Sequence, residues 1–210
     1  MNRKIQLVIF DLDGTLTPVD SLWRYLHEEL GTWEQGKIAA QKYKRGEISY
    51  KEWAETDAKC WAGAQLSQVT KTLDRIPYRE GVQNVFRFLH ERGLKTAIIS
   101  AGLSVFADKV AKELSADVTL ANELEANDGR LTGRIKVRVS LNQKRRLVEQ
   151  IAGQLGIELS QVALVGDRAF DLSPPECFRI AYKPKDDAAR RGADVVVEDN
   201  DLARILHYLV

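Results

Sequence analysis

The sequence predicts an α/β protein, a doubly wound, Rossmann-like parallel sheet with a helical cap inserted after the first strand. Short aliphatic runs alternate with helical periods along most of the chain, which favours parallel strands joined by right-handed crossovers. The runs are continuous rather than interrupted by polar residues, as expected of strands covered on both faces. The stretch from about residue 21 to residue 77 contains no convincing strand. We therefore predict a core domain of residues 1–18 and 78–210 and a cap domain of residues 19–77.

Six aliphatic runs bounded by turn residues are predicted to be strands. They are Leu7–Phe10, Thr96–Ile99, Val118–Leu120, Val162–Val165, Arg179–Tyr182 and Val195–Val197. Apolar residues recur at helical spacing between several of these runs. The predicted helices are Val82–Leu89, Phe106–Leu114, Leu147–Leu155 and Leu202–Leu209. An Asp128-Gly129 turn predicts a small hairpin beside the sheet.

The predicted cap contains three or four helices. Leu22, Leu26 and Leu30 lie on one helical face, Gly46 is a helix stop, and Ser49–Glu52 has the sequence of a capping box. All four tryptophans of the chain lie in this segment, at Trp23, Trp33, Trp53 and Trp61. The cap therefore has its own apolar residues to bury.

Composition narrows the range of partners. The chain has 210 residues, and its 31 basic and 30 acidic residues give a formal charge of +1, so we expect neither nucleic acid nor a membrane as a partner. Cys60 and Cys177 lie in unrelated contexts, which argues against a disulfide framework or a zinc site. The apolar run ending at Phe10 is about six residues long, too short for a secretory segment or a membrane span. We therefore expect a cytoplasmic protein with reduced thiols.

Two carboxylates, Asp11 and Asp13, directly follow the first predicted strand. Open α/β sheets bind ligands at the carboxyl ends of their strands. Enclosing paired anions there without compensation costs several kcal/mol, so a purely structural role is disfavoured. The pattern predicts a metal cation or a functional proton at this position.

The segment Asp11–Leu16, with the sequence DLDGTL, resembles the nucleophile motif of the haloacid dehalogenase superfamily. Three later residues match the remaining motifs of that superfamily in the same order. Ser100 follows the second strong strand, Lys144 opens a helix, and Asp167 follows the fourth aliphatic run. Each of these later residues, taken singly, is also a common capping, turn or surface residue. Their order after the first motif favours a functional site.

The resemblance implies phosphoryl transfer through an aspartyl phosphate. Asp11 would be the nucleophile. Asp13 would protonate the leaving alkoxide and then activate the water that hydrolyses the intermediate, a role that phosphatases need and dehalogenases do not. Ser100 and Lys144 would hold the phosphoryl oxygens while charge develops on them.

A metal site and substrate contacts are implied by the same resemblance. A Mg²⁺ ion would be held by Asp11, the backbone carbonyl of Asp13, and Asp167. Asp171 would support Lys144 or the metal shell. The implied backbone contacts to the substrate are at Leu12, Ala101 and Gly102.

Nearly the whole chain resembles the phosphoserine phosphatase branch, which implies a Mg²⁺-dependent phosphatase acting on a small phosphomonoester. Asp20 matches the position of the acid that receives the substrate ammonium group. The arginine expected to bind the substrate carboxylate falls at Asp57, and an acid does not replace a bidentate guanidinium clamp. Arg45 or Lys59 could take over that role. Phe170 also replaces an asparagine expected close to the substrate.

These departures leave alternatives open. If Asp20 and Asp57 both face the cap cavity beside tryptophans, the pocket would suit a cationic amine phosphoester, such as a phosphoethanolamine-, phosphocholine- or histidinol-phosphate-like compound. The competing interpretation is that the tryptophans pack the cap helices together and that Asp57 is a solvated helix residue. A phosphotransferase or mutase would use the same aspartyl phosphate. A non-enzymatic binding module would need a lesion in the chemical set, and the sequence contains none.

Overall fold

The computed structural model describes residues 4–209, so the outer limits of the predicted core domain, residues 1–3 and 210, lie outside the described residues. A seven-stranded sheet has the order β4-β3-β2-β1-β5-β6-β7 and is parallel except at the β3/β4 pair. The strands are β1 Leu7–Phe10, β2 Lys95–Leu103, β3 Val118–Asn127, β4 Arg130–Lys136, β5 Val162–Gly166, β6 Phe178–Tyr182 and β7 Val195–Val197. The predicted fold class is confirmed. The hairpin turn at 128–129 is also present, but its second arm, β4, is an edge strand of the sheet itself.

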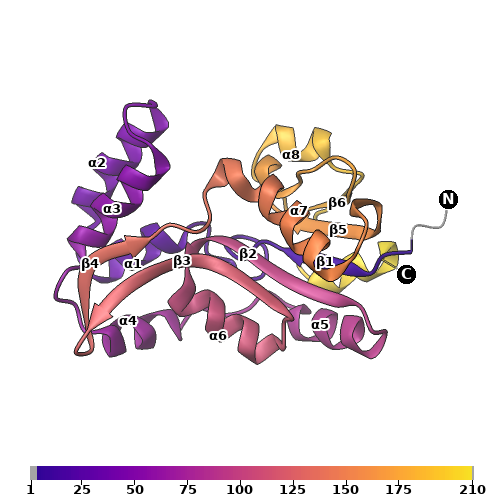
Figure 1. Cartoon of the computed structure of the whole chain (residues 1–210), viewed down its shortest axis with the longest axis horizontal. Helices are drawn as coiled ribbons and strands as arrows, with labels where there is room; N and C mark the ends of the chain where they lie inside the picture. Colours follow the sequence, from indigo (N-terminus) through magenta and orange to yellow (C-terminus); the bar gives the residue numbers. More distant parts are fainter. Residues whose placement is uncertain (1–3, 210) are drawn as a thin grey trace.

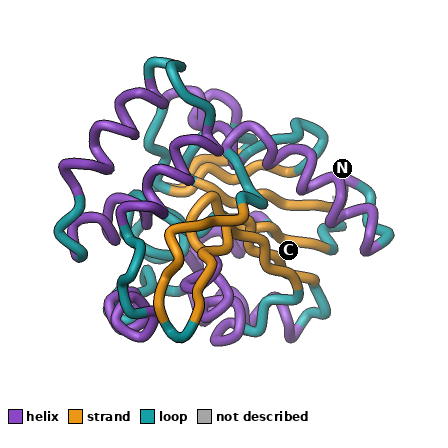
Figure 2. Tube along the Cα trace, turned by 60° about the vertical axis from the view of Figure 1, so that its left-hand side comes forward, coloured by secondary structure: helices purple, strands orange, loops and turns teal. Residues whose placement is uncertain are grey.

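Helices cover both faces of the sheet (Figures 1 and 2). The α-helices are α1 Leu22–Glu29, α2 Trp33–Lys44, α3 Tyr50–Cys60, α4 Leu66–Leu73, α5 Val82–Glu91, α6 Ser104–Leu114, α7 Lys144–Leu155 and α8 Asp187–Gly192. The 3-10 helices are η1 Leu141–Gln143, η2 Leu159–Gln161, η3 Ala169–Asp171 and η4 Leu202–Tyr208. The closing helix was predicted from the apolar period of an amphipathic α-helix, but the structure has a 3-10 helix there. No helix among residues 4–209 is long and apolar enough to cross a membrane.

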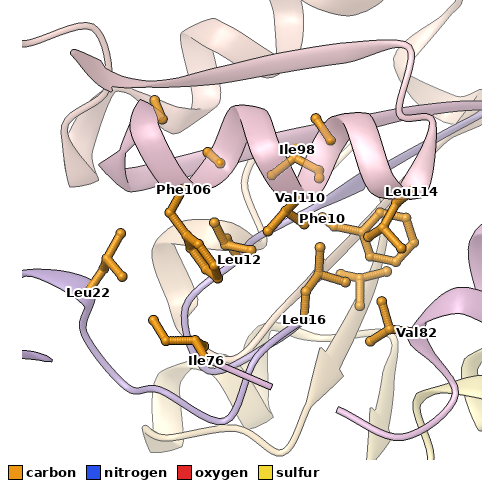
Figure 3. Packing of buried hydrophobic residues seen from close by; sticks show 14 of the residues in the cluster. Phe10, Leu12, Leu16, Leu22, Ile76, Val82, Ile98, Phe106, Val110 and Leu114 are labelled. Atoms are coloured by element: carbon orange, nitrogen blue, oxygen red, sulfur yellow. The ribbon is translucent and has the colours of Figure 1, made fainter. Parts of the chain in front are cut away.

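Two apolar clusters sandwich the sheet because successive side chains of a strand point to opposite faces. Val8 and Phe10 of β1 pack with α5, α6 and η4, whereas Leu7 and Ile9 pack with α7 and α8. Figure 3 shows the first cluster, in which Phe106 and Val110 of α6 lie close to residues from the loop that follows β1. These contacts anchor the loop after β1 to the core.

The four helices α1–α4 follow β1 and precede α5, which is where the cap was predicted. Their connection to the rest of the chain includes backbone hydrogen bonds between the α3–α4 turn and the β3–β4 hairpin. Gly63 N–H donates to the Leu131 carbonyl at 2.8 Å, and Leu131 N–H donates to the Ala64 carbonyl at 2.9 Å. The division of the chain into two domains at residues 19 and 77 stays a prediction.

One strand differs from its prediction in a way that affects the site. β2 continues past Ser100 to Leu103, so that Ser100 lies within the strand rather than at its end. Pairing with β3 is irregular between Ile99 and Leu103. The backbone of residues 100–102 is therefore free to make contacts other than regular strand pairing.

Candidate active site

The loop after β1 directs two carboxylates to the same side because a core residue separates them. Leu12 is fully buried, and its carbonyl accepts hydrogen bonds from Leu16 N–H (3.0 Å) and Thr17 N–H (3.2 Å). With Leu12 anchored in the core, Asp11 and Asp13 both line the cavity described below. The alternation of acid, leucine and acid in the sequence therefore fixes both the loop and its chemistry.

Asp13 is held at the start of the first cap helix. The backbone N–H of Leu22, in the first turn of α1, donates to Asp13 Oδ2 at 2.6 Å. The other oxygen, Oδ1, is buried and makes no hydrogen bond with a described residue. Burial, followed by the charge of Asp11, raises the pKa of Asp13 to about 7. Asp13 can therefore keep a proton near neutral pH and release it to a nearby oxygen.

A buried lysine joins two of the predicted residues. Lys144 Nζ donates to Asp11 Oδ1 and to Asp171 Oδ1, each at 2.5 Å, and all three side chains are less than 10% exposed. Arg168 N–H donates to the second oxygen of Asp171 at 3.0 Å. Because both Asp171 oxygens are engaged in this way, Asp171 is placed to orient Lys144.

Asp167, at the carboxyl end of β5, is the least satisfied acid of the group. It is 1% exposed, and its Oδ2 makes no hydrogen bond with a described residue. Burial, with the charges of Asp11 and Asp171, raises the pKa of Asp167 to about 8. A residue at position 14 with a Cβ would place that atom 2.2 Å from Asp167 Oδ2, so only Gly14 allows this approach.

The acidic group has the composition of a cation site. Carboxylate oxygens of Asp11, Asp167 and Asp171 lie within 4.8 Å of one another. Asp13 lies alongside this group. Among the described residues, these four carboxylates are accompanied by the buried ammonium of Lys144 and by the guanidinium of Arg168, which lines the same cavity and lies near Asp167, so negative charge is in excess. Such a charge imbalance needs protons or a bound cation, and all-oxygen ligands favour a hard divalent ion. Both oxygens of Asp171 already accept hydrogen bonds, whereas Oδ2 of Asp167 accepts none from a described residue. Asp167 is therefore the better candidate ligand of the two.

Ser100 and Gly102 form the opposite wall. Gly102 N–H donates to Ser100 Oγ at 2.9 Å, which leaves the hydroxyl proton of Ser100 available to another acceptor. An added Cβ at position 102 would lie 3.0 Å from Ser100 Oγ, a tight contact, and 3.5 Å from Asp13 Oδ2, an ordinary one, so this backbone lies next to both side chains. A small anion could thus contact both segments.

A cavity of about 520 Å³ extends from these residues into the cap helices. Of the predicted site residues, those that line it are Asp11, Asp13, Asp20, Asp57, Ser100, Ala101, Gly102, Lys144 and Asp167. Phe170 also lines the cavity, with its ring centroid 5.4 Å from Lys144 Nζ. Leu12 and Asp171 lie behind this lining. The fold thus brings Asp11, directly after β1, together with Asp167, more than 150 positions later in the sequence.

The two acids predicted for substrate selection differ from each other. Asp20 is 61% exposed and pairs with Lys185 at 2.9 Å. Asp57 is 1% exposed, and its Oδ1 lies 3.3 Å from His27 Nε2, so the interpretation of Asp57 as a solvated residue is wrong. Burial raises the pKa of Asp57, and His27 beside it opposes that shift. Neither Arg45 nor Lys59 lines the cavity.

The cap tryptophans do pack against one another, as one interpretation expected. The ring centroids of Trp23 lie 5.9 Å from Trp53 and 5.7 Å from Trp61. Trp23 and Trp53 also line the cavity, together with Trp33, so the same side chains pack the cap and face the site. His27, which the sequence interpretation missed, contacts Trp61 with ring centroids 4.7 Å apart.

Comparison with known proteins places these residues in a family. A family model described as haloacid dehalogenase-like hydrolase matches residues 8–173. The chain is 37% identical over 171 residues to a phosphoserine phosphatase of Archaeoglobus fulgidus, covering 81% of this chain and 49% of that protein. It is 29% identical over 212 residues to a phosphoserine phosphatase of Methanocaldococcus jannaschii, covering all of both chains. The chain therefore spans about half of the first relative and the full length of the second.

Solved structures give the same picture. A phospho-aspartyl intermediate analogue of phosphoserine phosphatase is similar to this chain with a TM-score of 0.84 and 28% identity, covering 99% of this chain and 100% of the other. A substrate-bound phosphoserine phosphatase complex is similar with a TM-score of 0.85 and 28% identity over the whole of both chains.

Proposed function

The chain belongs to the haloacid dehalogenase-like hydrolase family and is phosphoserine phosphatase-like, a phosphoric monoester hydrolase by class, and we propose that it hydrolyses a small phosphomonoester through a Mg²⁺-dependent aspartyl phosphate on Asp11. The observation that carries this proposal is the buried group of Asp11, Asp167 and Asp171, whose carboxylate oxygens lie within 4.8 Å of one another and two of whose members, Asp11 and Asp171, pair with Lys144. The neighbour that is a phospho-aspartyl intermediate analogue supports the covalent step.

The first step forms a bond between a carboxylate oxygen of Asp11 and phosphorus while the bond to the leaving oxygen breaks. Asp13 gives its proton to that oxygen, so the leaving group departs as a neutral alcohol while the phosphoryl group stays on Asp11. The raised pKa of Asp13, about 7, supports this assignment because the acid must still hold its proton when the substrate arrives. Ser100 and Lys144 donate to the phosphoryl oxygens and stabilise their developing charge.

The second step returns Asp11 to its starting state. The ionised Asp13 takes a proton from a water molecule, whose oxygen bonds to phosphorus while the bond to Asp11 breaks. Inorganic phosphate is released, and Asp13 is again protonated. One group thus acts as acid and then as base, which its position between the cavity and the N-terminal turn of α1 allows.

The residues fit a divalent cation. Asp11 and Asp167 would supply side-chain oxygens, and Asp13 would supply its backbone carbonyl. When bound, Mg²⁺ would neutralise part of the negative charge shared by the carboxylates and the phosphate. The unpartnered, buried Oδ2 of Asp167 supports this site.

Measurement of phosphate release tests the proposed function. We expect p-nitrophenyl phosphate to be hydrolysed in the presence of Mg²⁺, with radiolabel from a phosphorylated substrate recovered on Asp11 after acid quenching. Substrate consumption with little free phosphate would instead identify a phosphotransferase or mutase. Absence of turnover across a panel of phosphorylated metabolites would contradict the proposal.

Asp57 favours a second candidate substrate class, the cationic amine phosphoesters. Asp57 is buried and lines the cavity. The resemblance to phosphoserine phosphatases aligns it with the arginine expected to bind a substrate carboxylate, which an acid would not bind. Asp20 is 61% exposed and pairs with Lys185, whereas Asp57 is buried beside His27, so Asp57 is the acid that an ammonium group enclosed in the cavity would meet. We expect Asp57→Asn to lower kcat/KM for phosphoethanolamine more than for p-nitrophenyl phosphate, with Asp20→Ala as the parallel variant. Equal losses on both substrates would reject this substrate class and leave the phosphatase assignment intact.

A further inference from the structure

One backbone carbonyl beside the phosphate-facing wall accepts hydrogen bonds from three side chains. The oxygen of Ala101 accepts from Trp23 Nε1 at 2.9 Å, Tyr50 Oη at 2.6 Å and Asn122 Nδ2 at 2.9 Å. A carbonyl oxygen has two lone pairs, so three donors saturate it. Trp23 comes from α1, Tyr50 from α3 and Asn122 from β3. Three elements distant in the sequence therefore meet on a single peptide group.

Asn122 uses its entire hydrogen-bonding capacity. Its Oδ1 accepts from the backbone N–H groups of Arg138 (2.8 Å) and Val139 (2.9 Å). Its Nδ2 donates to the Ala101 carbonyl and, at 3.1 Å, to Tyr50 Oη. The side chain is fully buried, and an amide offers two donors and two acceptor sites, all of which are occupied here. Tyr50 remains a donor because burial raises the pKa of its hydroxyl.

The peptide bond carries this constraint to Ser100. In a trans peptide the C=O of one residue and the N–H of the next point in opposite directions. Fixing the Ala101 carbonyl therefore fixes the Gly102 N–H, which donates to Ser100 Oγ at 2.9 Å. Since the Ser100 oxygen accepts from Gly102 N–H and Ser100 lines the cavity, its hydroxyl can donate its proton to a group bound there.

Asn122 also holds the backbone of the segment that leads to Lys144, the other proposed phosphate-binding side chain. Arg138 and Val139 precede η1 and then Lys144, which opens α7. The same amide therefore ties the segment leading to Lys144 to the peptide that orients Ser100.

We propose that Asn122 is a positioning residue that aligns the Ala101–Gly102 peptide, and through it the Ser100 hydroxyl, with Trp23 and Tyr50 completing the alignment only while α1 and α3 lie against the core. Asn122 matters for catalysis in this way only if the proposed phosphatase function holds. The position of α1 and α3 would then affect the orientation of Ser100 through the hydrogen bonds of Trp23 and Tyr50 to the Ala101 carbonyl, with no contact between these two side chains and the phosphate.

Asn122→Asp is the sharpest test because it keeps the shape and the acceptor for Arg138 and Val139 but removes both N–H donors. We expect kcat for p-nitrophenyl phosphate to fall about 10-fold to 100-fold, with KM changing less than about 3-fold, since misplacement of a catalytic group by about 1 Å is worth that much. Tyr50→Phe, which removes one of three donors, should give a smaller loss in the same direction. Tyr43→Phe is the matched control: Tyr43 stacks in the same aromatic cluster, and its hydroxyl makes no hydrogen bond within the described residues.

A double-mutant cycle separates positioning from a general loss of structure. If Asn122 acts through Ser100, then Asn122→Asp made in a Ser100→Ala background should lower kcat by less than about 3-fold further. Losses that multiply would overturn the proposal, and so would an unchanged kcat in Asn122→Asp alone. If Asn122→Asp fails to fold, the cycle is run with Tyr50→Phe and Ser100→Ala.

A measurement that does not depend on turnover tests the positioning role of Asn122 separately from the proposed phosphatase function. Amide hydrogen exchange measured by NMR should show Gly102 N–H exchanging about 10-fold faster in Asn122→Asp than in the wild type, because its partner geometry is lost. Unchanged Gly102 exchange would contradict the positioning role. If the wild-type protein hydrolysed no phosphomonoester, the proposed function would fail, and the exchange result would still decide whether Asn122 orients this peptide.

Discussion

Gly14 is a position where a single methyl group should damage the site selectively. Its φ of +83° lies in the left-handed region, and an added Cβ would lie 2.2 Å from Asp167 Oδ2 and 2.9 Å from Asp167 Cγ. Gly93, in the turn before β2, has nearly the same backbone conformation, with φ +70°, but an added Cβ there would meet nothing within 4 Å. Gly14→Ala and Gly93→Ala therefore share the backbone strain and differ in the collision.

The shared strain costs about 1–2 kcal/mol of unfolding free energy, the usual penalty for an L residue in the left-handed region. Only Gly14→Ala must also displace the Asp167 carboxylate, and restoring an ordinary contact requires it to withdraw by about 1 Å, a misplacement worth roughly 100-fold in rate. We therefore expect similar losses of stability in the two variants and a roughly 100-fold lower kcat/KM in Gly14→Ala alone.

Urea unfolding would measure the stability of both variants, and hydrolysis of p-nitrophenyl phosphate at a series of Mg²⁺ concentrations would measure their activity. Gly14→Ala should also need more Mg²⁺ for half-maximal activity, because Asp167 is a proposed ligand. An activity of Gly14→Ala within about 3-fold of Gly93→Ala would refute the reasoning, since it would mean that the position of Asp167 does not matter at the 1 Å scale.

Three further predictions concern the charges of the site and the cap. Asp11→Asn should lower phosphate release by about 10⁴-fold or more, and Asp13→Asn by about 10²-fold to 10⁴-fold, because the first removes the nucleophile and the second the proton carrier; comparable residual rates in the two variants would contradict these roles. EDTA should abolish phosphate release and added Mg²⁺ should restore it, whereas full activity in EDTA would exclude the metal. Burial raises the pKa of Asp57 above its value in the unfolded chain, which is about 4. The protonated form therefore stabilises the fold fully below about pH 4, and this stabilisation is lost as the pH rises through the pKa of the folded state. The unfolding free energy of the wild type relative to Asp57→Asn should therefore fall in urea titrations as the pH rises above about 4. A rise would show that the carboxylate is favoured by its surroundings.

Local patterns were enough to predict the sheet and the first loop. A fully buried parallel strand such as β1 reads as an uninterrupted aliphatic run, and the two acids that follow it can only lie at the sheet's carboxyl edge. The motif around Asp11 is contiguous, so its geometry is set by neighbours in the sequence. Ser100 was located by the same logic, although β2 continues past it because residues 101–103 retain an extended backbone.

Contacts made across the fold were not predictable in this way. The sequence shows Asp57 as one acid among charged helical neighbours, and only the packing of α1 against α3 buries it beside His27. Asn122 likewise stands in a strand segment with no apparent partner, yet it joins Tyr50, 72 positions earlier, to the carbonyl of Ala101. Chemistry that depends on a contiguous motif can thus be predicted from a single sequence, because neighbouring residues of the chain fix the relative positions of the motif's side chains. The side chains that select the substrate depend on the register of the cap helices. A shift of one residue would turn a different set of side chains toward the cavity, and no local pattern specifies this register. For this reason the reaction class of such a protein can be inferred earlier than its substrate.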